Sequence, residues 1–158
     1  MDHTLREWVR LGEKCGLAQA ALDAQAKETR MDRTHIRQVM LAHWHDMQSA
    51  IRTGLEPGLR SVSGLSGGQA VKLLNRMQEG KSLCGTLLGK AEAYALATAE
   101  CNACMGRIVA APTAGASGVL PAVLLPIRKK YDFSEEEMVK ALYVSAGFGQ
   151  VIATRASI

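Results

Sequence analysis

Aromatic residues, prolines and cysteines are all scarce in this sequence. Its 158 residues include 2 Trp, 3 Tyr and 2 Phe, with 4 Pro and 4 Cys. So few aromatics leave little with which to stack bases, and the only adjoining basic residues are Arg128, Lys129 and Lys130, so we expect no nucleic-acid partner. Four cysteines are too few for a disulfide scaffold. No apolar run reaches the eighteen or so residues of a membrane span, so we expect no membrane partner.

The rest of the composition is typical of a folded protein, and the middle of the chain carries an excess of basic residues. Hydrophobic residues make up 47% and charged residues 22%, which excludes intrinsic disorder and leaves enough apolar surface for a core. Residues 61–130 carry eight basic and three acidic groups and are rich in glycine. Such a segment suits a small anionic substrate, including a carboxylate. The polar start, Met1 to Thr4, is no signal peptide, so we expect a cytoplasmic protein with reduced thiols.

The hydrophobic period is helical almost throughout and predicts an all-α fold. We expect a compact bundle of about seven or eight helices, with Gly-rich active-site loops. Asp32 can cap one helix, and Ser134 to Glu137 is a capping box. We expect a single helical domain over 1–158, made of an N-terminal helical cap (1–53) and a Gly-rich half of catalytic type (54–158). The apolar end, 151–158, carries no helix stop signal, so we expect this chain to be the front part of something longer.

Two short patterns have a functional and an ordinary interpretation. Lys81 and Ser82 follow Gly80, but a P-loop would need glycine at position 75, which is Asn. They form either a solvated turn or a surface that faces an anionic substrate. Cys101 and Cys104 have the spacing of half a metal site, but a closed site needs more ligands. The periodicity predicts an Ala-rich helix over residues 86–103. We interpret Cys101 and Cys104 as structural cysteines at the end of that helix, so the sequence predicts no metal ligand.

The strongest local signal is the small-residue segment 106–121. It allows a ligand to approach the backbone closely, and it leads into a helix whose N-terminus attracts anions. Thr113, Ala114 and Gly115 could therefore cradle a carboxylate. A tight helix–helix crossing would need the same small residues, and spacing alone does not separate the two interpretations.

Four motifs, in order, resemble the iron–sulfur-dependent L-serine dehydratase (L-serine ammonia-lyase) alpha subunit or alpha domain. They are Gly64-Leu-Ser-Gly-Gly-Gln-Ala-Val-Lys-Leu73, Gly80-Lys-Ser-Leu83, Asn102 to Pro121, and Ala153-Thr-Arg-Ala-Ser-Ile158. The resemblance implies conversion of L-serine to pyruvate and ammonia by a 4Fe-4S enzyme. An open iron would act as a Lewis acid on the substrate hydroxyl while a base removes the α-proton.

The same resemblance implies where the parts of the site lie. The family's three cluster cysteines follow the Ala-Ser-Ile run, so this chain would carry part of the substrate wall and no cluster ligand. Thr113 and the backbone of Ala114 and Gly115 would bind the serine carboxylate, with Lys81 and Ser82 supplying charge and hydrogen bonds nearby. The α-proton base stays unassigned. The implied partners are L-serine and a beta subunit or beta domain, and a homodimer is compatible with them.

Two other functions fit parts of the sequence. A self-contained helical interaction module without catalysis would be a stable monomer that needs no further sequence. A pyridoxal-phosphate serine dehydratase would need a Schiff-base lysine in an α/β scaffold. The absence of predicted strands argues against that second alternative.

Overall fold

A computed structural model describes residues 4–155 of the chain, and within that range it contains helices and no strand. This confirms the predicted all-α fold. None of the helices in this range is long and apolar enough to cross a membrane. The helices are α1 (Leu5–Cys15), α2 (Leu17–Thr29), α3 (Arg33–Gly54), α4 (Gln69–Gln78), α5 (Gly85–Ala103), α6 (Val119–Tyr131) and α7 (Glu135–Arg155).

The contacts divide the chain into two compact units. Unit 1 combines residues 1–42 with residues 134–158, and unit 2 is the continuous stretch 43–133. The first part of α3 belongs to unit 1 and its last part to unit 2. The boundary expected from the sequence, between residues 53 and 54, follows the change of composition along the chain and stays a prediction, whereas these units follow contacts in space.

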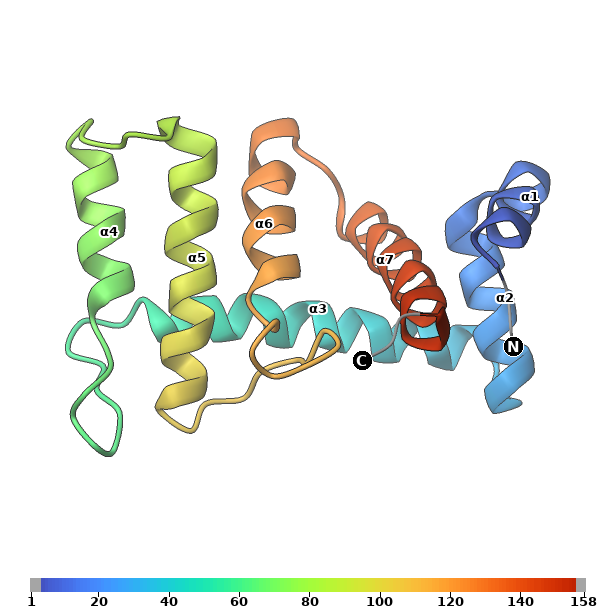
Figure 1. Ribbon diagram of the computed structural model, residues 1–158, viewed down its shortest axis with the longest axis horizontal. Helices are drawn as coiled ribbons and strands as arrows, with labels where there is room; N and C mark the ends of the chain where they lie inside the picture. Colours follow the sequence, from blue (N-terminus) through green and yellow to red (C-terminus); the bar gives the residue numbers. More distant parts are fainter. Residues whose placement is uncertain (1–3, 156–158) are drawn as a thin grey trace. The chain divides into compact units, whose positions relative to one another are not determined.

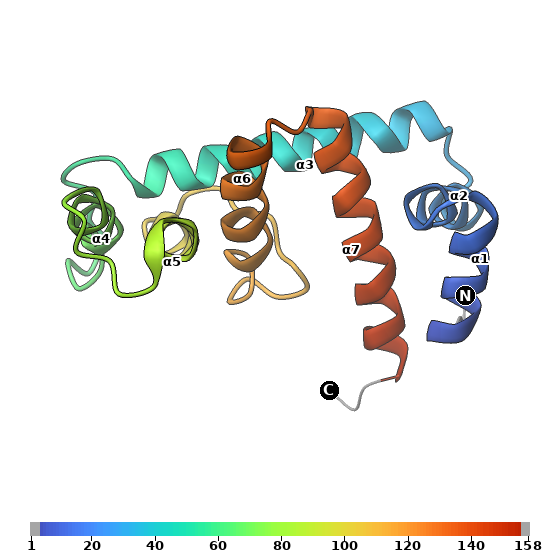
Figure 2. The ribbon, with the colours of Figure 1, turned by 90° about the horizontal axis from the view of Figure 1, so that it is seen from above.

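Unit 1 is built on a small core shared by α1, α2, α7 and the start of α3. Figure 2 shows α7 beside the α1–α2 pair. Its buried side chains include Trp8, Leu22 and Tyr143. A Cβ atom on Gly147 would overlap the indole of Trp8, so α1 and α7 approach closely at that glycine.

Three helices of unit 1 begin with caps made by neighbouring residues. The Thr4 side chain accepts from the Glu7 N–H, and the Glu7 carboxylate accepts from the Thr4 N–H. Ser134 and Glu137 repeat this capping box at the start of α7, as predicted. Asp32 accepts from the Thr34 N–H at 2.8 Å and so caps α3, also as predicted. Each of these caps satisfies amides that the helix itself leaves unpaired.

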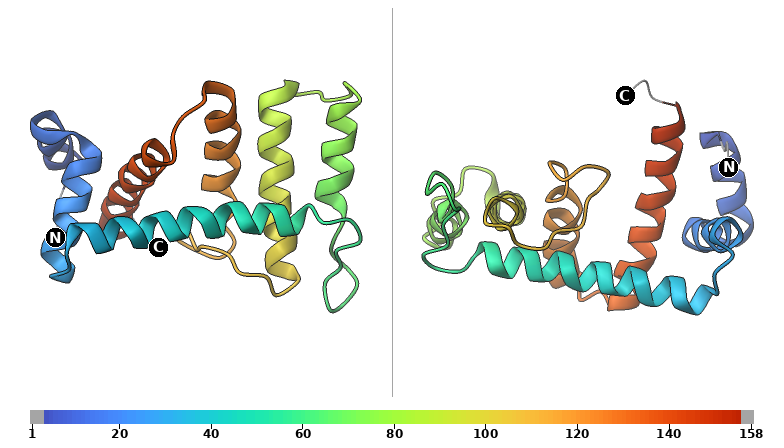
Figure 3. Two further views of the ribbon diagram at one scale, coloured as in Figure 1. Left: turned by 180° about the vertical axis from the view of Figure 1, so that it is seen from behind. Right: turned by 90° about the horizontal axis from the view of Figure 1, so that it is seen from below.

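Unit 2 places α5 between α4 and α6 (Figure 1). The end of α3 lies across these helices (Figure 3), and its Trp44 and Ile51 are buried. Ala93 and Ala97 of α5 have no exposed surface, and a Cβ on Gly54 would overlap the backbone of Ala97. Small residues on α5 therefore let its neighbours pack closely, which explains why this helix is rich in alanine.

Candidate functional site

Two Gly-rich segments of unit 2 lie at the same end of α5, which we call the loop end. One is the loop 55–68 between α3 and α4, and the other is the segment 104–118 between α5 and α6 (Figures 1 and 3). The turn 79–84, between α4 and α5, lies at the opposite end, which we call the turn end. The predicted site residues are divided between these two ends.

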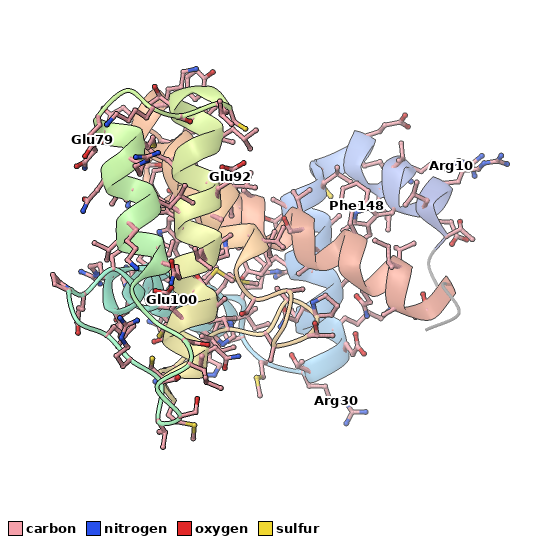
Figure 4. The ribbon with its side chains drawn as sticks, turned by 60° about the vertical axis from the view of Figure 1, so that its left-hand side comes forward. Arg10, Arg30, Glu79, Glu92, Glu100 and Phe148 are labelled. Atoms are coloured by element: carbon pink, nitrogen blue, oxygen red, sulfur yellow. The ribbon has the colours of Figure 1, made fainter. Side chains whose placement is uncertain are left out.

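A buried carboxylate organises the loop end. Glu100, in the last turns of α5, is 4% exposed, and its two oxygens face the first turn of α4. They accept from the backbone N–H groups of Gly68 and Gln69 at 2.9 and 2.7 Å, and from that of Ala70 at 3.3 Å. Figure 4 labels Glu100 beside this end of α4 and Glu79 at the other end. The helix N-terminus therefore has an anion in place, supplied by α5.

Close contacts at Gly67 hold the loop 55–68 in shape and leave no room for a side chain at that residue. Gly67 has a φ of +126°, and a Cβ there would overlap the carbonyl of Leu59. The Arg60 guanidinium donates to the carbonyl oxygen of Gly67. These constraints explain why glycine precedes α4: residue 67 must allow both an unusual backbone angle and a close approach of the chain.

The segment around Thr113 forms local turns and leaves several amides unpaired. The Thr113 hydroxyl oxygen accepts from the Ala116 N–H at 3.2 Å, so its own proton is free to point elsewhere. The carbonyl of Ala114 accepts from Ser117 at 3.2 Å. Within the part of the chain that the structure describes, the N–H groups of Thr113, Ala114 and Gly115 have no acceptor. All three residues are exposed, so this short run of donors is accessible to an anion.

The glycines of this segment differ in their surroundings. A Cβ on Gly118 would lie 2.9 Å from the carbonyl oxygen of Ala95, so the start of α6 packs tightly on α5 at that point. Gly115 has open space, with only the hydroxyl of Thr113 at 3.9 Å. Gly118 is thus required by a helix–helix contact, whereas no close contact explains the glycine at position 115, and the role of residues 113–115 stays a prediction.

Lys81 and Ser82 are not near Thr113. They lie at the turn end, and α5, with its 19 residues and a length of about 28 Å, separates that end from the loop end. Lys81 pairs with Glu79 at 2.8 Å, and the Ser82 hydroxyl donates to the Gly85 carbonyl at 3.1 Å. The expectation that these residues supply charge beside Thr113 therefore has no support within unit 2, because the helix between them is too long.

The four cysteines occupy four different environments. Cys101 is buried, and burial followed by the nearby Cys104 and Glu56 raises the pKa of its thiol. A Cβ on Gly106 would overlap the Cys101 sulfur, so this thiol is packed as a core group, as predicted. Cys104 is half-buried, while Cys15 and Cys84 are exposed, and the carboxylate of Glu92 raises the pKa of Cys84.

These positions do not fit an iron–sulfur cluster. A cluster with one open iron needs three thiolates that converge on it. Among residues 4–155 no group of three or more His, Cys, Asp or Glu side chains is arranged to hold a metal ion. The described residues therefore supply no cluster site, and the location of the cluster cysteines beyond Ile158 stays a prediction.

The structural roles of two residues at the loop end, Glu100 and Arg60, were not predicted from the sequence. Glu100 is one of two acidic residues in an Ala-rich helix, and nothing in its neighbours indicates that it meets residues 68–70. Arg60 sits in a stretch interpreted only as a break. Tertiary packing brings their partners close to them. The one available signal was a charged residue, Glu100, on a helix face whose other residues are small or apolar and suited to burial.

Comparison with known proteins places the chain in a family. A family model described as "Serine dehydratase alpha chain" matches residues 12–158. A probable L-serine dehydratase alpha chain of Bacillus subtilis is 46% identical over 112 residues, which are 71% of this chain and 37% of that protein. The L-serine dehydratase alpha chain of Peptoniphilus asaccharolyticus is 33% identical over 159 residues, covering 99% of this chain and 54% of that one.

The matched relatives are longer than this chain. An L-serine dehydratase of Streptomyces coelicolor is 32% identical over 158 residues, which cover 96% of this chain and 34% of that protein. The chain thus spans about half or less of the length of these curated relatives. No solved structure matches it. With the family model covering nearly all of its residues, the chain belongs to the serine dehydratase alpha chain family.

Proposed function

We propose that this chain forms the substrate-binding wall of an L-serine ammonia-lyase, which converts L-serine to pyruvate and ammonia. Family membership supports the reaction, and the names of the relatives support the substrate. The enzyme would also contain a 4Fe-4S cluster, held by cysteines outside the described residues, and a beta subunit or beta domain.

The observation that carries this proposal is the run of unpaired amides at residues 113–115. Three successive exposed N–H donors in the segment that precedes α6 suit a carboxylate, which can accept from more than one of them. The Thr113 hydroxyl, whose oxygen already accepts from Ala116, can donate its proton to the same ligand. In this arrangement the chain binds and orients the carboxylate of serine, and the α-proton base has no candidate among these residues.

Kinetics of the intact dehydratase test this assignment. We expect Thr113→Val to lower kcat/KM for L-serine about ten- to a hundred-fold, since a hydrogen bond to a charged group contributes roughly 1.5–3 kcal/mol. Thr86→Val is the matched control, because Thr86 is also exposed but lies at the turn end. Equal kinetics in the two variants would contradict the proposal.

The roles of Lys81 and Ser82 are tested separately. If either residue contacts substrate, it must do so in a site completed by another chain or segment, because Thr113 lies at the other end of α5. Lys81→Ala in the same enzyme would then raise KM for L-serine, independently of the effect of Thr113→Val. An unchanged KM in this variant would remove Lys81 from the substrate site and leave the assignment at residues 113–115 intact.

A further inference from the structure

The loop end of unit 2 carries a tight turn, residues 61–66, which we call the loop tip. Ser61 and Ser66 close it: the Ser61 N–H donates to the Ser66 carbonyl at 2.9 Å, and the Ser66 N–H donates to the Ser61 hydroxyl at 3.1 Å. Gly64, with a φ of +73°, donates to the Ser61 carbonyl at 2.9 Å. The loop tip thus has its own network of hydrogen bonds and needs no outside contact to keep its shape.

The loop tip exposes two aliphatic side chains to solvent. Val62 is 92% exposed and Leu65 is 90% exposed, and Met105, at the same end of unit 2, is 84% exposed. Scattered exposed apolar residues are ordinary, but Val62 and Leu65 both belong to one hydrogen-bonded turn, and we call these two side chains the apolar knob. Because the backbone is already ordered, burying the knob would cost little conformational entropy, which favours a docking role.

We propose that the loop tip docks into an apolar pocket on the remaining part of the alpha chain, with Val62 and Leu65 as the inserted side chains. This rests on the proposed function, which requires the cluster-bearing part of the enzyme to reach the loop end. Nearly half of the Peptoniphilus alpha chain lies outside its match to these residues, so an alpha chain of this family has the polypeptide to provide the pocket.

Two further arguments favour this occupant over a separate subunit. A segment of the same polypeptide is present at high effective concentration, so a knob of two side chains suffices to hold it, whereas a separate chain needs a much larger surface. The polar side chains of the loop tip are the uncharged hydroxyls of Ser61, Ser63 and Ser66. They offer no charge pattern by which a separate protein chain could be selected.

Photo-crosslinking in the assembled enzyme tests the docking. A photoreactive amino acid replaces Val62, or separately Leu65, in a complete alpha chain of this family that carries these residues and is assembled with its beta chain. After irradiation, mass spectrometry identifies the crosslinked peptide, and mixed isotope labelling distinguishes crosslinks within one alpha chain from those between two copies. The same reagent at Leu83, fully exposed at the turn end, is the matched control.

The expected result is a crosslink from positions 62 and 65 to the part of the same alpha chain beyond the matched residues, absent when the reagent is at position 83. Crosslinks to the beta chain, to a second alpha copy or only within the described residues would overturn the proposal, as would no crosslink or the same product from position 83. The readout needs no turnover, so its failure is distinguishable from a failure of the Thr113→Val experiment.

Discussion

Helices begin in different ways in the two units of this protein. In unit 1, α1 and α7 start with capping boxes, Thr4 with Glu7 and Ser134 with Glu137, in which each partner is three residues from the other. In unit 2, α4 has no side-chain cap from the residue before it, and its first amides are satisfied by Glu100, thirty or more residues away. A local cap stabilises one helix, whereas the distant cap also joins two helices and holds the loop between them.

The largest effect is expected from removing the distant cap. Glu100→Ala would leave the amides of residues 68–70 without their acceptor in a partly buried place, at roughly 1–3 kcal/mol for each donor that water does not reach. We therefore expect unit 2 to lose about 3 kcal/mol or more. Urea unfolding followed by the fluorescence of Trp44, in a Trp8→Phe background, measures this. Glu100→Gln, which keeps one oxygen, is the control and should lose less; an equal loss, or a loss below about 0.5 kcal/mol for Ala, would contradict the assignment.

The glycines of the two ends of unit 2 should respond unequally to alanine. Gly67→Ala places a Cβ against the backbone of Leu59 at a φ of +126°, and we expect a loss of about 2–4 kcal/mol. Gly80, at the turn end, has a φ of +75° but open space around it. Gly80→Ala should therefore cost only about 1–2 kcal/mol, the penalty of the backbone angle alone. Similar losses in the same urea assay would show that loop 55–68 is not tightly constrained.

A smaller effect is expected at the local cap of α7. Ser134→Ala removes the side-chain acceptor for the Glu137 N–H, which should cost about 1 kcal/mol. Urea unfolding followed by circular dichroism measures the loss. Ser134→Asp, which keeps an acceptor at the same position, should restore stability to within about 0.5 kcal/mol. A Ser134→Asp variant as unstable as Ser134→Ala would contradict the capping role.

The smallest effect concerns the pH dependence of this same capping box. Hydrogen bonds from the backbone N–H and hydroxyl of Ser134 lower the pKa of Glu137. A lowered folded-state pKa means that the carboxylate stabilises α7 above the unfolded pKa of about 4.3. That contribution is lost as the pH falls through the lowered pKa that Glu137 has in the folded protein. An NMR titration of the Glu137 carboxyl should give a midpoint below about 4.3, which Ser134→Ala raises toward that value. The same midpoint in both proteins would refute this.

The local features of the fold could be predicted from the sequence. The helical period, the Gly-rich breaks and the capping signals at Asp32 and Ser134 all depend on residues a few positions apart. The predicted helix 86–103 differs from α5 by one residue at its start. The contact of Glu100 with residues 68–70 could not be predicted, because it depends on how α4 and α5 pack, and the same holds for the pairing of α7 with α2.

The candidate site could be predicted from the sequence only in part. Residues 113–115 could be singled out from the sequence because their side chains are small, and their exposed amides without an acceptor are compatible with the predicted carboxylate site, which stays a prediction. Lys81 and Ser82, grouped with them through the family resemblance, lie at the other end of α5, and their role in substrate binding also stays a prediction. The helix predicted between them is about 27 Å long, so its two flanking segments point to opposite ends of the unit.

Hydrogen exchange at three amides tests the central structural claim most directly. If Glu100 caps α4, the amides of Gly68, Gln69 and Ala70 are protected in the folded protein, although the first amides of a helix have no partner within it. We predict slow exchange at these amides in the native chain and fast exchange in Glu100→Ala, with the interior amides of α5 unchanged. Fast exchange at all three amides in the native chain would contradict the capping by Glu100 and the account of the loop end built on it.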